Sequence, residues 1–161
     1  LIPDNDVFSF TDEIFSVQYW ARTSTTTGFN LYKGSTTSNR EYASLFDADL
    51  AAFRIFNNGS ITTEWAKGTT DVVDGNWHHI VATADGTNLK IYVDGVLEDT
   101  ISITYNMGNY TSAINVARYG GGYAYWTGDM KNLAFWDRAL NATEISDLYN
   151  SGSGLNYEGL W

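Results

Sequence analysis

The stretch from Asp74 to Thr100 reads DGNWHHIVATADGTNLKIYVDGVLEDT, and it decides the fold of the chain. Asp85-Gly86 and Asp94-Gly95 each lie between apolar runs. Because glycine accepts the positive φ of a type I′ turn, Asp-Gly in that setting is a strong hairpin signal. Residues 77–84 are almost wholly apolar, which is typical of a strand covered on both faces. The stretch therefore predicts three antiparallel strands joined by tight turns.

Short runs with strand periodicity continue on both sides of this block. The expected strands are 15–22, 29–33, 42–46, 50–56, 61–65, 113–117 and 130–136. Residues 67–71 are expected to form a loop, and residues 157–161 to return as an edge strand. Some ten short strands with a turn at nearly every interval favour a β-sandwich or jelly roll.

The periodicity changes near the C-terminus. Asn141-Ala-Thr-Glu144 has the form of a capping box, which satisfies two free amides at the start of a helix. Ile145, Leu148 and Tyr149 then share one helical face, and Gly152 is the expected stop. The sequence predicts an all-β fold, a two-sheet antiparallel jelly-roll sandwich with one short C-terminal helix of about three turns. We expect residues 1–161 to form a single domain.

The composition excludes several classes of protein. The chain has 19 acidic and 9 basic residues and a net charge of −10, so duplex nucleic acid would be repelled. No apolar run is long enough to insert into a membrane. There is no cysteine, which excludes a disulfide scaffold and a thiolate site. The chain begins at Leu1 without an initiator methionine, so we expect a mature product or a piece of a longer protein.

Three segments carry a family resemblance. They are residues 15–20, residues 74–96 and residues 128–149, the last reading GDMKNLAFWDRALNATEISDLY. Together they resemble the laminin-G-like branch of the concanavalin A-like lectin/glucanase superfamily. The resemblance implies two packed antiparallel sheets. It also implies a carbohydrate- or protein-binding module of an extracellular, cell-surface or virion protein, although other members are spacers and the fold alone does not fix the function.

Calcium is the one cofactor that the resemblance raises, because many relatives hold an ion between the N-terminal strand and the last one. Calcium needs several oxygen ligands. The candidate ligands are Asp4, Asp6, Asp12 and Asp129. Relatives commonly read Gly-x-Ile-Asp at the position where this chain has Gly128-Asp-Met-Lys131. Lys131 therefore stands where an acid is frequent, and it argues against the ion.

Catalysis has little support in the sequence. The related glucanases carry a strand that resembles Glu-x-Asp-x-x-Glu, which places two carboxylates on one face, and this chain lacks that spacing. Asp47 and Asp49 are the nearest pair, and a solvated turn explains them better than a glycosidase pair or a cation ligand does. His78 and His79 point to opposite faces of a strand, so they cannot share one metal, and we interpret both as packing residues.

The sharpest functional feature is an aromatic loop, defined here as residues 119–126. It carries Tyr119, Tyr123, Tyr125 and Trp126 around three glycines. Surface loops on a rigid scaffold often carry function. Aromatic rings can stack on a sugar or insert into a protein interface. Three interpretations stay open at this point: a lid over the end of the sandwich, a sugar platform, and a contact with a protein or a second copy.

These observations predict a non-catalytic binding module that recognises carbohydrate or a protein partner through its loops. The alternative is a structural or assembly subunit, in which the aromatic loop and the termini make chain-to-chain contacts. A glycoside hydrolase is third, because the catalytic strand is missing. We expect an extracellular, cell-surface or virion location, with no nucleic acid partner and no membrane insertion.

Overall fold

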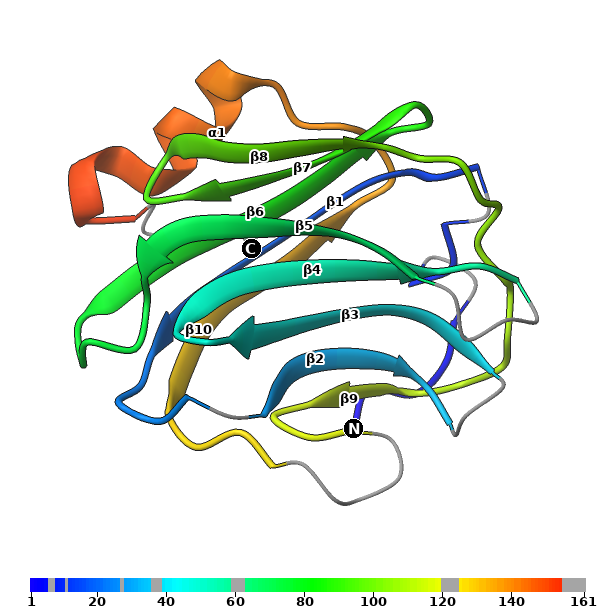
Figure 1. Cartoon of the computed structure of the whole chain (residues 1–161), viewed down its shortest axis with the longest axis horizontal. Coiled ribbons are helices and arrows are strands. Elements are labelled where there is room, and N and C mark those ends of the chain that lie inside the picture. The colour runs from blue at the N-terminus through cyan, green and yellow to red at the C-terminus, as the bar shows by residue number, and fades with distance from the viewer. Residues whose placement is uncertain are drawn as a thin grey trace, which may run out of the picture.

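The computed structural model describes residues 1–5, 8–10, 12–26, 28–35, 39–58, 63–119 and 125–154. These residues form two five-stranded antiparallel sheets, which we call sheet I and sheet II (Figure 1). Sheet I has the strand order β10-β1-β6-β7-β8, and sheet II has the order β5-β4-β3-β2-β9. The predicted two-sheet antiparallel sandwich is confirmed.

The strands follow one another along nearly the whole chain. Their bounds are β1 Ile14–Arg22, β2 Phe29–Gly34, β3 Arg40–Asp47, β4 Leu50–Phe56, β5 Thr63–Asp71, β6 Trp77–Asp85, β7 Asn88–Val93, β8 Val96–Ser102, β9 Ile114–Val116 and β10 Asp129–Trp136. The second hairpin turn has φ of 51° at Asp94 and 79° at Gly95, as a type I′ turn requires.

The core lies between the two sheets, where alternate side chains of each strand meet. Phe15, Val17 and Tyr19 of β1 face Phe53 and other apolar side chains of sheet II, and these side chains are almost completely buried. The hydroxyl group of Tyr19 lies 2.6 Å from Oγ of Ser44, so this polar atom is satisfied inside the sandwich. Because one face of every strand is used for the core, binding groups can lie only on the uncovered parts of the outer faces and at the strand ends.

Helix α1, Ala142–Tyr149, packs on the outer face of sheet I (Figure 1). Its Ile145 and Leu148 contact Val81 of β6 and Tyr92 of β7. The capping box is confirmed, because Asn141 accepts hydrogen bonds from the amides of Thr143 and Glu144, and Glu144 accepts one from the amide of Asn141. In the part of the chain that the structure describes, no helix has the length and apolar character needed to cross a bilayer.

The predicted end of this helix is wrong. The α-helix has eight residues and ends at Tyr149, and its capping residue Asn150 adopts φ 47° and donates its amide to the carbonyl of Ser146. Asparagine is one of the few residues that enter the left-handed region readily. Asn150 therefore stops the α-helix before Gly152, and a short 3-10 turn, Asn150–Gly152, follows. The edge strand expected at 157–161 lies outside the described residues.

The loop predicted at residues 67–71 is also wrong, because these residues continue β5. Asp71 pairs with Leu50 of β4. The carboxylate of Glu98, on β8, accepts hydrogen bonds from the amides of Thr69 and Thr70. Partners that are distant in sequence thus hold this segment in an extended conformation, although glycine at position 68 is a residue type depleted in strands.

Candidate functional site

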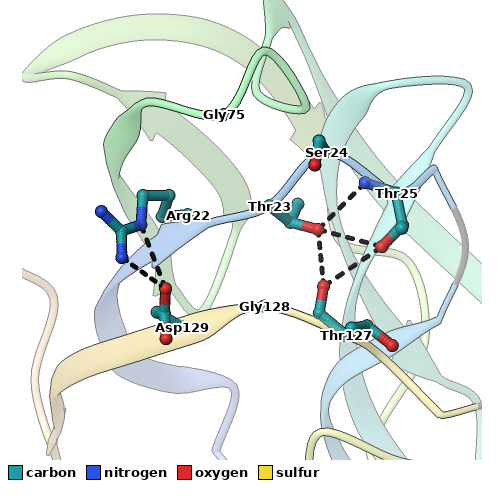
Figure 2. Close-up of a pocket in the computed structure, with 8 residues that line it drawn as sticks. All are labelled: Arg22, Thr23, Ser24, Thr25, Gly75, Thr127, Gly128 and Asp129. Atoms are coloured by element: carbon teal, nitrogen blue, oxygen red, sulfur yellow. Dashed lines mark hydrogen bonds and ion pairs between the residues drawn. The ribbon is translucent and has the colours of Figure 1, made fainter.

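A pocket of about 270 Å³ opens at the rim of the sandwich, where β1 ends and β10 begins. It is lined by Arg22, Thr23, Ser24, Thr25, Gly75, Thr127, Gly128 and Asp129. In Figure 2, Arg22 and Asp129 lie on one side, and three threonines lie on the other. Hydroxyl groups and one pair of opposite charges therefore dominate the lining.

Strand pairing brings these distant segments together. Arg22 and Asp129 are opposite partners at one end of the antiparallel β1–β10 ladder. Gly128 permits the close approach, because a Cβ atom there would lie 2.5 Å from the carbonyl oxygen of Arg22. Any larger residue at Gly128 would push the two strands apart and open the pocket wall.

The charged side of the pocket is an Arg–carboxylate pair. Nε and Nη2 of Arg22 donate to Oδ2 of Asp129 over 3.0 and 2.7 Å. The side chains are 47% and 58% exposed, so a ligand can reach both groups. Because both bonds end on one carboxylate oxygen, Oδ1 of Asp129 stays available as an acceptor and Nη1 of Arg22 as a donor.

The other side of the pocket is a network of threonine hydroxyl groups. Oγ1 of Thr23 donates to the carbonyl of Thr127 over 2.6 Å, and Oγ1 of Thr25 donates to the same carbonyl over 3.1 Å. The amide of Thr25 donates in turn to Oγ1 of Thr23. These bonds fix the loop after β1 against the segment before β10, so the polar groups of the pocket are held in place before a ligand arrives.

The turn before β6 forms the remaining wall. Gly75 adopts φ 85° and donates its amide to the carbonyl of Thr23 over 3.0 Å. The neighbouring Asp74 accepts hydrogen bonds from the amide and side chain of Asn76 and contacts His78. The bonds from Asn76 and His78 lower the pKa of Asp74 to about 2. The turn therefore places a carboxylate that is ionised at neutral pH, and paired with His78, beside the pocket.

Basic side chains cover Trp77 next to the pocket. The guanidinium of Arg22 lies 5.1 Å from the centre of the Trp77 ring, and Nζ of Lys131 lies 4.4 Å from it. Within the described ranges Lys131 has no carboxylate partner. Lys131, at a position where the family resemblance led us to expect an acid, thus places its cation over the ring of Trp77.

The four calcium candidates are not gathered at one place by the described residues. Asp4 pairs with Lys33 over 2.6 Å, and Asp129 pairs with Arg22. Asp12 caps the amide of Ile14 at the opposite end of β1, whereas Asp6 lies outside the described residues. No group of three metal-ligating side chains occurs in the described ranges. Calcium binding stays a prediction, and an unchanged melting temperature at millimolar calcium would contradict it.

The aromatic loop divides into buried and exposed parts. Trp126 is 5% exposed and belongs to the core, and Tyr119 packs on Phe29 and Tyr32. Tyr125 is 64% exposed. Tyr123 lies outside the described residues. Two of the four rings therefore fold back onto the sandwich, and Tyr125 is left at the surface on the chain segment that leads to Thr127 in the pocket.

The two histidines have different environments. His79 is buried and packs against the rings of Trp20 and Tyr149, which also pack on each other, as the packing interpretation predicted. His78 instead contacts two carboxylates, those of Asp74 and Asp94. Its role in holding the turn beside the pocket was not anticipated from the sequence.

Sequence reasoning identified Asp129, but as a metal ligand, and it missed the other residues that line the pocket. One signal was present, because the alternating strand that ends at Arg22 runs directly into the hydroxyl-rich segment 23–27. The partners Thr127 and Asp129 come from more than 100 residues further along the chain. Only the β1–β10 register places them opposite that segment.

Comparison with known proteins agrees with this architecture. A laminin G-like family profile, described as the concanavalin A-like lectin/glucanases superfamily, matches residues 2–146. A comparison with curated protein sequences gives no significant match.

Several solved structures share the fold. The binding domain of Paraclostridial Mosquitocidal Protein 1 matches with a TM-score of 0.72 and 15% identity, over 93% of this chain and 40% of that one. The binding domain of botulinum neurotoxin DC matches in a complex with rat synaptotagmin II, with a TM-score of 0.71 and 15% identity over 92% of this chain and 38% of that one. The binding domain of botulinum neurotoxin DC in a complex with SialylT matches with a TM-score of 0.69 and 17% identity, over 92% of this chain and 38% of that one. The chain thus spans about two fifths of these proteins, and the likeness concerns the fold.

Proposed function

Because the chain belongs to the concanavalin A-like lectin/glucanases superfamily, we propose that it is a non-catalytic module that binds carbohydrate through the pocket between β1 and β10. One observation carries the proposal. The pocket combines an accessible Arg–carboxylate pair with a fixed set of threonine hydroxyl groups. Sugar hydroxyl groups both donate and accept hydrogen bonds, so they can use the acceptor of Asp129 and the donor of Arg22 together.

The size of the pocket limits the ligand. Drug-sized ligands occupy sites of roughly 300–1,000 Å³, whereas this pocket measures about 270 Å³. It therefore fits one terminal sugar residue rather than a long stretch of polysaccharide. The fixed polar groups on its two sides favour an orientation in which neighbouring hydroxyl groups of one ring bridge Arg22 and Asp129.

The structural neighbours support a binding role in general terms. They are binding domains, and two of the complexes contain rat synaptotagmin II and SialylT. This chain corresponds to only part of each, so their partners belong to those proteins. The extracellular, cell-surface or virion location remains part of the proposal.

A hydrolytic role is less well supported. Glycoside hydrolysis usually needs two carboxyl groups that flank the bond to be broken. Asp129 is the single carboxylate among the described residues that line the pocket, and Arg22 neutralises it. The pocket is thus equipped to hold a sugar, and it lacks a second acid to cleave one.

A second candidate function is chain-to-chain assembly, and Tyr125 favours it. Its ring is 64% exposed, whereas most large apolar side chains of the described residues are buried. Exposed tyrosine is enriched in protein interfaces, since it offers a large contact area at low entropy cost. Light scattering across a concentration series separates the two functions, because assembly predicts a mass that grows with concentration and falls in Tyr125→Ala.

The test of the main proposal is a panel of immobilised neutral and acidic glycans, followed by calorimetry with the best binder. Arg22→Gln removes the pocket donor, and we expect it to weaken binding about tenfold, the size of one charge-assisted hydrogen bond. Arg138→Gln is the control, because Arg138 is about as exposed as Arg22 and forms an ion pair with Glu144 at the start of α1, outside the pocket. Equal binding by the two variants, or no binding to any glycan by the wild type, would overturn the proposal.

A further inference from the structure

The outer face of sheet II carries a second group of basic and aromatic side chains. Arg54 of β4 pairs across the sheet with Trp65 of β5. Lys67 lies two residues beyond Trp65, so it projects from the same face. Their neighbours Phe53 and Ile55 point into the core, which places Arg54, Trp65 and Lys67 on the outside. We call these three residues the Arg54 cluster.

Arg54 is held in an unusual state. Its Cζ atom lies 4.3 Å from the centre of the Trp65 ring, which is a cation–π distance. Its Nε is buried and has no hydrogen-bond partner. Lys67 uses the nearby carboxylate of Asp47 in an ion pair of 2.7 Å, and within the described ranges Arg54 has no ion pair of its own.

The carboxylate of Asp47 acts on Arg54 as well as on Lys67, so two cations share one negative charge. A partly desolvated guanidinium that lacks an ion pair of its own is costly. Burial also lowers the pKa of Arg54 from its ordinary value, and the carboxylate of Asp47 opposes this change without cancelling it. The chain as a whole has 19 acidic and 9 basic residues, so carboxylates outnumber cations about two to one. The cluster nevertheless keeps one cation available, and an anionic group from outside the chain would supply its missing partner.

The same face continues as a basic and aromatic strip toward β2 and β3. The guanidinium of Arg40 lies 5.4 Å from the centre of the Phe56 ring, and Phe56 is two residues beyond Arg54 on β4. Nη2 of Arg40 donates to the hydroxyl of Tyr119 over 3.2 Å. Three of the nine basic residues therefore gather on one sheet face, with rings between them.

We propose that this face binds an acidic saccharide, whose carboxylate or sulfate pairs with Arg54 and whose ring lies against the exposed part of Trp65. Guanidinium groups bind both kinds of anion through paired hydrogen bonds. Trp65 is 36% exposed, so apolar ring surface is accessible next to the cation. A nucleic acid fits less well, because few cations and a large negative net charge oppose a long polyanion.

The Arg54 cluster shares no residue with the pocket between β1 and β10. The cluster lies on sheet II, whereas β1 and β10 belong to sheet I. The inference goes beyond the proposed function and does not depend on it. A chain that binds neutral sugars in the pocket and nothing at the Arg54 cluster would refute only the inference. A chain that binds acidic sugars at the Arg54 cluster and no sugar in the pocket would refute only the proposed function of the pocket.

The experiment is an NMR titration of the intact chain with three probes that share one scaffold: 3′-sialyllactose, lactose 3′-sulfate and lactose. We expect the two acidic probes to shift the Nε–H signal of Arg54 and the indole N–H signal of Trp65, whereas lactose leaves both in place. The comparison of the two acidic probes distinguishes a carboxylate from a sulfate ligand. Unmoved Arg54 and Trp65 signals with both acidic probes would overturn the inference, and this result needs no variant.

Calorimetry on variants gives the second measurement. Arg54→Gln should weaken binding of the preferred acidic probe about tenfold or more, and Arg54→Lys should recover part of the loss. Lys90→Gln is the control, because Lys90 forms a partly exposed ion pair on sheet I. Binding at the Arg54 cluster should also weaken as salt rises, since the pairing is electrostatic. Wild-type affinity in a folded Arg54→Gln chain would contradict the inference.

Discussion

The Nδ1 atom of His78 lies 2.8 Å from Oδ2 of Asp94, and this contact joins the start of β6 to the β7–β8 turn. Nε2 of the same ring lies 3.1 Å from Oδ1 of Asp74. A neutral imidazole can donate from only one of its nitrogens, so two flanking carboxylates favour the protonated ring. The bond to Asp94 accordingly raises the pKa of His78, although burial opposes it, and the bond to Asp74 adds to the rise.

We predict that His78 stabilises the fold at low pH and loses this effect as the pH rises. The pKa is raised above its unfolded value of about 6.5, so the contribution is complete below that value and is lost as the pH passes the folded pKa. Chemical denaturation of wild type and His78→Gln should differ by about 1 kcal/mol near pH 6, the scale of a partly exposed ion pair. A difference that grows between about pH 6 and pH 9 would contradict the assignment.

His79 should show the opposite dependence. Burial lowers its pKa to about 4, because the ring packs against Trp20 and Tyr149 away from water. The unfolded chain therefore binds this proton more readily, and stability falls as the pH drops from about 6.5 toward 4. NMR titration of the ring protons should give His79 a pKa well below that of His78. In His79→Phe, which keeps an aromatic ring but cannot titrate, the loss of stability over this pH range should be smaller.

Lys33 should be costly to replace. Its ammonium group is completely buried and contacts Asp4 over 2.6 Å and Glu41 over 3.1 Å, and Glu41 is equally buried. Lys33→Met would leave the carboxyl of Glu41 without its cation, which typically costs about 3–5 kcal/mol. The double variant Lys33→Met with Glu41→Gln removes both charges and should recover part of that loss in a denaturation experiment. A single variant as stable as wild type would contradict the buried pair.

The start of α1 offers a smaller and separate test. Asn141→Ala removes the side chain that accepts from the amides of Thr143 and Glu144, and it should lower the free energy of unfolding by about 1 kcal/mol. Asn150→Gly is the contrasting variant, because φ at Asn150 is 47° and glycine tolerates that conformation well. We expect the second variant to be neutral or slightly stabilising. A larger loss from Asn150→Gly than from Asn141→Ala would refute this account of the helix ends.

Much of the sandwich could be predicted from local sequence. The turn at Asp94-Gly95 and the capping box at Asn141 each depend on residues a few positions apart, so the sequence contains all the information needed. The extension of β5 through Asp71 could not be predicted in this way. Its amides are satisfied by Glu98, on a strand nearly 30 residues away.

The binding sites illustrate the same limit. Arg22 and Asp129 look unrelated in the sequence, and they meet only because β1 and β10 pair, with a register shift within β1 that sets the partners at this end. Arg54 and Trp65 likewise need the β4–β5 register to place a guanidinium over an indole ring. Sequence reasoning favoured the aromatic loop because its residues are adjacent, but two of its rings turn inward. The sequence shows which residue types could bind a ligand, whereas the pairing of the strands determines which of them lie next to one another.

The most direct test of the central claim is an amide NMR titration of the wild-type chain with the tightest-binding sugar of the glycan panel. The account predicts that the amide signals of Thr23, Thr25, Gly75 and Gly128 shift and saturate together, because these residues line one pocket. It also predicts that Arg22→Gln needs about ten times more sugar to give the same shifts. Binding that leaves all four wild-type signals unmoved would show that the pocket between β1 and β10 is not the carbohydrate site.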